Sequence, residues 1–219
     1  MKKGIVLLSG GLDSTVLTYY LKNKGYDLIA VSFDYGQRHK KELECAKKTC
    51  EKLKIPHKIF DISVPMAQLE SSSALLNSEK EIPHEHYTHE NQKQTVVPNR
   101  NMILLSFAIG LAESKGINKV FYAAHFNDRA IYPDCRKEFV RYLSIASRYG
   151  TYTKVSVLAP FVKLTKADIV KIGLELKVPF EDTWSCYEGK ELACGKCGTC
   201  QERLEAFAKN RAKDPIKYE

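Results

Sequence analysis

Five short apolar runs constrain the fold of this chain more than any other feature of its sequence. They lie at residues 4–8, 28–33, 58–62, 119–126 and 155–161. Segments with the apolar spacing of amphipathic helices separate them. Strands without polar alternation, separated by helices, predict a parallel sheet that is covered on both faces. We therefore expect an α/β fold whose open parallel sheet is of the Rossmann-like type.

Two of the helices have predictable starts. Asn99 is a candidate cap for the helix that follows it, and Thr165 with Asp168 three residues later predicts a capping box. We expect the apolar residues of the helix after Asn99 to include Met102, Leu105, Phe107 and Ile109.

The stretch LLSGGLDST, residues 7–15, places two glycines where the first predicted strand gives way to a helix. Gly10 and Gly11 allow a tight turn and let the backbone approach an anion without a Cβ in the way. The free N–H groups and the positive dipole end of the next helix favour phosphate. Asp13 would be repelled by bare phosphate, so a Mg²⁺ that bridges phosphates is its better partner. Three hydroxyls can add hydrogen bonds: those of Ser9, Ser14 and Thr15. We expect a nucleotide phosphate site, although a plain strand–turn–helix connection has the same spacing.

Polar side chains also gather after other predicted strands. Arg100 stands at a helix start, where a cation opposes the helix dipole and suggests a nearby anion. Lys163 and Lys166 could contact phosphates or only solvate a helix start. Residues 34–39 follow the second strand, where the base and ribose of a nucleotide would lie; they supply Asp34, Gln37, Arg38 and His39. The block after the fourth strand supplies His125, Asp128, Tyr132, Asp134, Cys135 and Arg136. Cys135 could be a nucleophile, but a small buried thiol is the favoured interpretation.

Four of the seven cysteines crowd into fifteen residues near the C-terminus. They are Cys186, Cys194, Cys197 and Cys200. Four thiolates with this spacing can surround a Zn²⁺ ion tetrahedrally. A 4Fe–4S cluster is the rival interpretation, because ferredoxins share the C-x-x-C-x-x-C spacing. Either way, the pattern indicates metal chemistry rather than a disulfide framework.

Residues 66–95 form a long polar insertion that is either functional or disordered. Its His84, His86 and His89 fit no strong metal-ligand spacing, so a solvated loop is the favoured interpretation. The start of the chain shows no signal-peptide pattern, and no apolar run is long enough to span a membrane. We expect a cytoplasmic protein without a membrane partner. The net charge of +8 suits anionic partners such as nucleotides or RNA.

The string SGGLDS closely resembles the pyrophosphate loop of the N-type ATP pyrophosphatases. Together with FDYGQRH, VPNRN, YPDCR, PFVKLTKADIV and the TWSC…CGKCGTC tail, it is similar to the 7-cyano-7-deazaguanine synthase family over nearly the whole chain. Asn99 departs from the glycine that this family usually has, but asparagine tolerates a left-handed backbone. The insertion at 66–95 is poorly matched.

The resemblance implies an adenine nucleotide alpha hydrolase-type domain over residues 1–180 and a zinc-binding segment over 181–219. It implies an ATP-dependent carbon–nitrogen ligase of queuosine biosynthesis that uses 7-carboxy-7-deazaguanine, ammonium and ATP with Mg²⁺. It also favours one structural Zn²⁺, a homodimer, and no nucleic-acid partner. The nucleotide-binding residues that it implies are Leu8, Ser9, Gly10, Gly11, Leu12, Asp13, Ser14, Thr15, Val16, Leu17, Thr18 and Asp34.

Candidate catalytic residues follow from side-chain chemistry within this resemblance. Asp13 would hold Mg²⁺ and Ser14 would contact phosphate. Arg100 and Arg136 could bind the substrate carboxylate or the leaving phosphate, and Asp134 could bind the guanine-like N–H edge. Two other functions stay open. One is a tRNA-thiolating enzyme with the same loop, and the other is a nucleic-acid-binding zinc-ribbon protein.

Overall fold

A five-stranded sheet forms the centre of the computed structural model, which describes residues 2–69, 73–76, 82, 95–130 and 132–219. All neighbouring strands are parallel, and their order across the sheet is β3-β2-β1-β4-β5. The strands are β1 (Lys2–Leu7), β2 (Tyr26–Asp34), β3 (His57–Asp61), β4 (Lys119–Phe121) and β5 (Ser156–Leu158). The α/β prediction with an open parallel sheet is confirmed.

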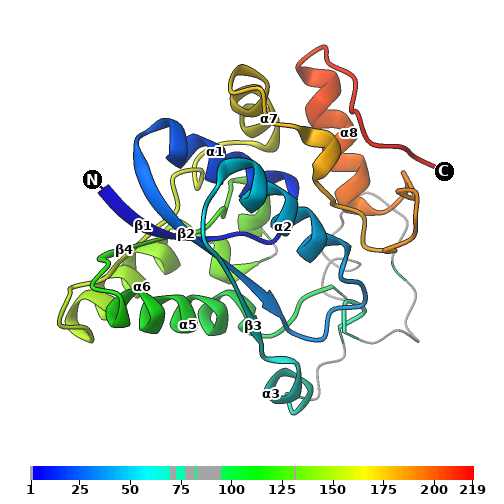
Figure 1. Ribbon diagram of the computed structural model, residues 1–219. Coiled ribbons are helices and arrows are strands. Elements are labelled where there is room, and N and C mark those ends of the chain that lie inside the picture. The colour runs from blue at the N-terminus through cyan, green and yellow to red at the C-terminus, as the bar shows by residue number, and fades with distance from the viewer. Residues whose placement is uncertain (1, 70–72, 77–81, 83–94, 131) are drawn as a thin grey trace.

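Helices cover both faces of this sheet (Figure 1). On one face lie α1 (Leu12–Asn23), α2 (Lys41–Leu53), α7 (Lys166–Glu175) and α8 (Gly198–Lys209). On the other lie α5 (Arg100–Ser114) and α6 (Lys137–Tyr149). Successive residues of a strand point to opposite faces. Val6 accordingly packs in the cluster with α1 and α7, whereas Ile5 packs in the cluster with α5.

Short elements complete the described chain. They are α3 (Ser63–Ala67) and the 3₁₀ turns η1 (Asn127–Ala130), η2 (Pro133–Cys135) and η3 (Phe180–Asp182). None of the helices that the structure describes is both long and apolar enough to cross a membrane. The histidines of the polar insertion, His84, His86 and His89, lie outside the described residues.

The strands β4 and β5 are shorter than the apolar runs that predicted them. Of residues 119–126, only Lys119–Phe121 belong to β4. The chain keeps one more bond, from Tyr122 N–H to the carbonyl of Leu158, and then leaves the ladder. The apolar residues just beyond this point belong to the wall of a pocket and do not pair with a neighbouring strand. An apolar run in the sequence cannot distinguish burial in a strand from burial in a pocket wall.

Helix starts follow the sequence prediction at one helix and depart from it at another. The capping box of α7 is confirmed, with Thr165 N–H donating to Asp168 and Asp168 N–H donating to the Thr165 hydroxyl. Asn99 adopts the left-handed backbone that the resemblance requires, with φ at 54°, but its side chain caps nothing. The carboxylate of Asp134 instead accepts the N–H of Asn101 at 3.0 Å. The predicted face of α5 is also partly wrong, because Phe107 is 41% exposed.

The C-terminal segment packs against the body along α7 and α8 (Figure 1). Phe207 of α8 stacks edge-to-face on Phe180, with ring centroids 5.0 Å apart. Arg203, fully buried, donates to Asp214 at 2.7 Å and to the carbonyl of Phe180 at 3.0 Å. A buried guanidinium with its hydrogen bonds satisfied fixes this segment on the sheet domain.

Candidate active site

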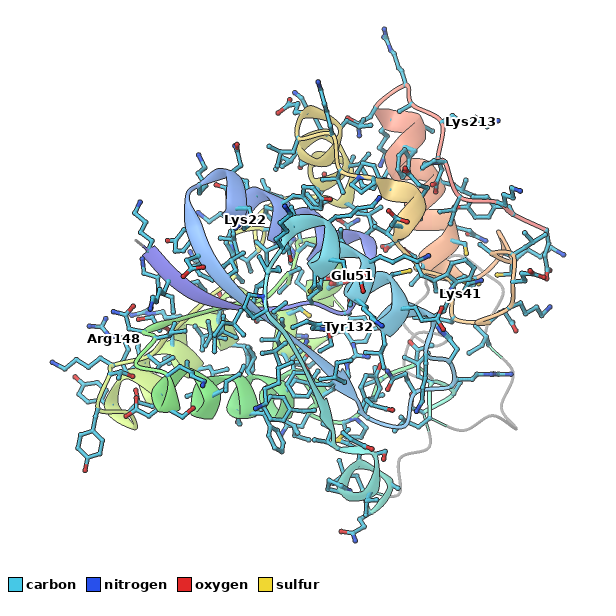
Figure 2. The ribbon with its side chains drawn as sticks, viewed as in Figure 1. Lys22, Lys41, Glu51, Tyr132, Arg148 and Lys213 are labelled. Carbon is cyan, nitrogen blue, oxygen red and sulfur yellow. The ribbon has the colours of Figure 1, made fainter. Side chains whose placement is uncertain are left out.

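A cavity of about 270 Å³ opens at the carboxyl ends of β1, β2 and β4. The strand order reverses beside β1, which is where open α/β sheets bind ligands. Residues from the glycine loop, α2, α5, the segment after β4, α7 and the C-terminal segment line this cavity. In Figure 2, the labelled Tyr132 lies in this central region, and Arg148 lies at the periphery on α6.

The glycine loop has the conformation that its sequence predicts. Gly10 has φ at +91°, and a Cβ there would clash with the carbonyl oxygen of Glu42 in α2. Glycine is therefore required at position 10 by both the backbone angle and the packing. The loop is held from the other side by the N–H of Trp184, which donates to the carbonyl of Gly10 at 3.1 Å.

The two predicted phosphate-binding serines brace the loop. The hydroxyls of Ser9 and Ser14 lie 2.9 Å apart, and Gly11 N–H donates to the Ser9 hydroxyl at 3.1 Å. Ser14 also donates to the carbonyl of Gly11 at 3.2 Å. The loop therefore holds its turn through its own hydroxyls, and its shape is set before a ligand arrives.

Five charged side chains form a network beside the loop, which we call the Lys166 cluster. Its members are Asp13, His125, Asp128, Lys166 and Glu202. Lys166 Nζ lies 3.5 Å from Asp13 and 3.1 Å from Glu202. His125 Nε2 lies 3.2 Å from Asp128 and 3.7 Å from Asp13. These residues come from α1, the segment after β4, α7 and α8, so only the folded chain brings them together.

The charges of the Lys166 cluster set one another's protonation. Burial alone would raise the pKa of Asp13, but Lys166 and His125 hold it well below its ordinary value. Burial would lower the pKa of His125, but Asp128 and Asp13 raise it. Burial raises the pKa of Asp128. Asp13 is thus a fixed carboxylate, and its Oδ1 is buried without a hydrogen-bond partner among the described residues. An unpartnered carboxylate oxygen beside a phosphate loop suits a divalent cation.

Arg100 stands on the other side of the cavity in a different setting. Its guanidinium lies 5.8 Å from the centre of the Tyr35 ring and donates to the Tyr35 hydroxyl at 3.4 Å. It makes no ion pair with any carboxylate that the structure describes. A guanidinium that lines a pocket without a close ion pair is available to an anionic group of a ligand.

Glu42 also lines the cavity. It lies in the first turn of α2 and makes no hydrogen bond or ion pair with a residue of the described part of the chain. Burial raises its pKa to about 7, with Arg100 acting to lower the value and Asp13 to raise it. We call Arg100, Tyr35, Tyr132 and Glu42 the Arg100 end of the cavity.

The structure places several predicted site residues at the cavity and others away from it. Leu8, Ser9, Gly11, Leu12, Asp13, Ser14 and Arg100 line it. Thr15, Val16, Leu17 and Thr18 are buried in α1 and do not line it. Asp34 lies outside the lining and pairs with Lys40 at 2.6 Å.

In the segment after β4, some of the predicted site residues also line the cavity and others do not. Cys135 lines the cavity, and burial raises its pKa, which favours the neutral thiol over a nucleophilic thiolate. Asp134 does not line it, because its carboxylate is bound to the start of α5. Arg136 is exposed, and its Nε donates to the carbonyl of Arg129 at 3.0 Å. The structure therefore brings Arg100, but not Arg136 or the side chain of Asp134, to the site.

Sequence reasoning missed Glu42, Glu202 and Trp184, which all line the cavity. Glu42 and Glu202 lie in ordinary amphipathic helices, where an isolated glutamate carries no signal of function. The tryptophan is the only one in the chain. The one signal in the sequence was its place two residues before Cys186. In the structure its N–H binds the carbonyl of Gly10 and so links the cysteine segment to the glycine loop.

The four clustered cysteines meet in space. All four are buried, and their sulfur atoms lie within 4.8 Å of one another. Backbone N–H groups donate to these sulfurs, from Cys194 to Cys186 at 3.3 Å and from Cys197 to Cys194 at 3.3 Å. The cluster can hold a metal ion, and the N–H donors suit thiolate ligands.

The C-terminal segment reaches the cavity from this cluster. Lys41 of α2 lies over the ring of Trp184, 3.8 Å from its centre, and its Nζ donates to two carbonyls, those of Lys190 and Glu191, at 2.7 Å. Figure 2 shows the labelled Lys41 on the side of α2 that faces this segment. Trp184 and Glu202 each lie two residues from a cysteine of this cluster, and both line the cavity.

Comparison with known proteins agrees with these features. The family described as "Queuosine biosynthesis protein QueC" matches residues 3–211. The chain is 56% identical to the 7-cyano-7-deazaguanine synthase of Caldicellulosiruptor saccharolyticus over 217 residues, which cover 99% of this chain and 96% of the relative. It is 51% identical to that of Methanoregula boonei over 217 residues, 99% of both chains.

Two solved structures resemble the fold. The NMN synthetase of Francisella tularensis has a TM-score of 0.57 at 14% identity, covering 96% of this chain and 77% of that one. A tRNA thiolase of Methanococcus maripaludis, solved with its 4Fe–4S cluster, has a TM-score of 0.55 at 17% identity, covering 98% and 68%. At these identities the likeness concerns the fold alone.

Proposed function

The chain belongs to the family of the queuosine biosynthesis protein QueC, and from this premise we propose how its cavity makes 7-cyano-7-deazaguanine. The substrates are 7-carboxy-7-deazaguanine, ammonia and two molecules of ATP. A carboxylate is a poor electrophile, and transfer of AMP to one of its oxygens turns that oxygen into a good leaving group. Ammonia then gives the amide, and a second adenylation on the amide oxygen lets AMP leave as the nitrile forms. AMP and diphosphate are released twice.

The glycine loop takes the β- and γ-phosphates in this proposal. The turn at Gly10 and Gly11 and the N-terminus of α1 supply N–H groups and a positive dipole end. Asp13 fits Mg²⁺ through its unpartnered Oδ1, and the ion would neutralise phosphate charge as the α–β bond breaks. Lys166 supplies a fixed positive charge on the same side.

Arg100 takes the carboxylate of the deazaguanine substrate. Arg100, which makes no ion pair with a described carboxylate, and the glycine loop line one cavity, and this is the observation that carries the proposal. A carboxylate bound there would face the α-phosphate of a nucleotide whose outer phosphates occupy the loop. Guanidinium and carboxylate match in a two-bond geometry that an ammonium cannot reproduce.

The metal in the cysteine cluster is Zn²⁺ in this proposal. Zinc–sulfur bonds of about 2.3 Å put tetrahedral sulfurs about 3.8 Å apart. This is compatible with four sulfurs that all lie within 4.8 Å of one another. A 4Fe–4S cluster carries each thiolate on a different iron and holds the sulfurs farther apart. With four protein ligands the ion is structural, and the residues that it fixes at the cavity are Trp184 and Glu202.

The alternative of tRNA thiolation requires a pair of reactive cysteines at the site. Among the described residues that line the cavity, Cys135 is the one cysteine, and its pKa is raised. This supports the ligase over the thiolase. The homodimer stays a prediction.

Incubation with ATP, ammonium and 7-carboxy-7-deazaguanine tests the proposal. We expect mass spectrometry to detect the nitrile and AMP, with two AMP formed for each nitrile. Formation of ADP in place of AMP, or nucleotide turnover that does not depend on the carboxylate substrate, would contradict it.

A further inference from the structure

Among the described acidic residues that line the cavity, Glu42 is the one whose side chain has no partner. It makes no hydrogen bond or ion pair with a described residue, whereas Asp13, Asp128 and Glu202 are all paired in the Lys166 cluster. A carboxylate that stabilises a fold is normally paired or solvated at the surface. A carboxylate that faces a cavity without a partner is available to a ligand.

The position of Glu42 is fixed by the phosphate loop. The first turn of α2 packs directly on Gly10, where an added Cβ would also lie 2.8 Å from the N atom of Ala46. A Cβ at Gly11 would lie 3.7 Å from Oε1 of Glu42. The carboxylate therefore stands beside the loop residue that begins α1 and, like Arg100, faces the cavity between them. This is the space in which the adenylated carbon would lie.

The other titratable groups of the cavity are less suited to accept a proton. The pKa of Asp13 is held low by Lys166 and His125. His125 is paired with two aspartates that favour its protonated form. Burial raises the pKa values of Tyr35 and Cys135, which keeps both groups neutral. His39 hydrogen-bonds the backbone of Cys186, and its Nδ1 is enclosed.

On these grounds, and resting on the proposed function, we propose that Glu42 is the general base of both nitrogen steps. In the first step, ammonia attacks the acyl-adenylate and a C–N bond forms. The C–O bond to AMP breaks, and AMP takes the electron pair. The new nitrogen gives one proton to the Glu42 carboxylate, which leaves the neutral amide.

In the second step, the amide oxygen attacks the α-phosphorus of ATP, and diphosphate leaves. The product carries an NH₂⁺ group on the carbon that is bonded to O–AMP. Nitrile formation breaks this C–O bond, with the electron pair going to AMP, and the nitrogen loses two protons. Glu42 accepts one of them and water the other. The pKa of Glu42, about 7, lets it accept a proton and return it to solvent at neutral pH.

Glu42→Gln keeps the shape of the side chain and removes its basicity. We expect nitrile formation to slow by about 10²- to 10⁴-fold, the usual contribution of a general base. Carboxylate-dependent exchange of labelled diphosphate into ATP, which reports adenylation alone, should stay close to wild type. Glu42→Asp should recover part of the nitrile rate. Glu44→Gln, an exposed neighbour on the same helix, is the matched control and should match wild type in both assays.

The amide taken as substrate gives a pH profile that ammonia does not complicate. The groups near Glu42 are Arg100 of α5, Asp13 of α1, Tyr35 after β2 and Cys45 on α2 itself. The wild-type rate from amide to nitrile should rise with pH through an apparent pKa of about 7, and Glu42→Gln should lack that rise.

Different results would overturn the role of Glu42 and the proposed function on which it rests. Wild-type nitrile rates in Glu42→Gln would overturn it. Loss of diphosphate exchange in a variant that unfolds like wild type would also overturn it, since Glu42 would then act in binding. A wild-type protein with no carboxylate-dependent exchange would refute the proposed function itself.

Discussion

The two ends of the cavity differ in how their charges are compensated. In the Lys166 cluster every charged side chain has a partner of opposite sign within 4 Å. At the Arg100 end, the guanidinium contacts only tyrosine, and the Glu42 carboxylate has no partner in the described chain. At the first end ion pairs hold the charged side chains in place, and only Oδ1 of Asp13 is left for a cation. At the second end no ion pair with a described residue holds Arg100 or Glu42, so both side chains are available to a substrate.

This difference separates stability from catalysis. Removing one member of a buried ion pair leaves the other charge unpaired and destabilises the fold. Removing a charge that has no protein partner leaves the fold intact and removes only an interaction with the ligand. Substitutions at the two ends should therefore differ in whether they change stability or turnover.

Removal of the metal should disrupt the Lys166 cluster most strongly. Structural zinc contributes about 10–16 kcal/mol to folding in small peptides at neutral pH. Chelation should therefore release Glu202 and Trp184 and abolish most ATP binding, measured by calorimetry, and added zinc should restore it. Undiminished ATP affinity in the metal-free protein would contradict this, and iron in the purified protein would refute the zinc assignment.

Lys166→Met should destabilise the fold by about 3–5 kcal/mol, because it leaves Asp13 and Glu202 buried without their cation. Denaturant unfolding measures the change. Lys171→Met, an exposed position on the same helix, is the matched control and should have little effect. Equal stability of the two variants would contradict the separation.

Arg100→Met should leave the unfolding free energy near wild type and weaken binding of the carboxylate substrate. A hydrogen bond to a charged group contributes about 1.5–3 kcal/mol, which corresponds to roughly a 10- to 100-fold rise in KM. Steady-state kinetics with varied 7-carboxy-7-deazaguanine measure it. A change confined to the KM for ATP would contradict this role and would indicate that Arg100 binds the phosphates of ATP.

The pH dependence of stability should report His125. Its pKa is raised in the folded chain, so its contribution is fully present below its ordinary value of 6.5 and is lost as pH rises through the folded pKa. Asp13 acts in the opposite sense, and its contribution is lost as acid pH approaches its depressed pKa. The difference in unfolding free energy between wild type and His125→Gln, without ATP or Mg²⁺, should therefore shrink toward alkaline pH. A constant difference would contradict the pairing.

Arg136→Met should have the smallest effect. The sequence suggested this arginine as a carboxylate ligand, but the structure places it outside the cavity. KM and kcat should both stay near wild type. A rise in the KM for the carboxylate substrate comparable to that of Arg100→Met would restore the sequence prediction.

The sequence determined the parts of this protein that are local or periodic. Apolar runs fixed the parallel sheet, and SGGLDS fixed the phosphate loop, because a left-handed turn at Gly10 depends on a few adjacent residues. For the same reason the cysteine spacing predicted the four-thiol cluster, which can hold a metal ion. The local sequence could not show that the carboxylate of Asp134 binds the start of α5, because this contact joins residues that are 33 positions apart in the chain.

Which charges are paired depends on the tertiary structure. Asp13, Lys166 and Glu202 come from three helices, and their contacts cross more than a hundred residues of chain between the first two. Whether a glutamate is an ordinary surface residue or a partnerless carboxylate beside a phosphate loop depends on what other segments bring to it. Glu42 became notable through the packing of α2 on Gly10, because burial and the charges around a group set its pKa.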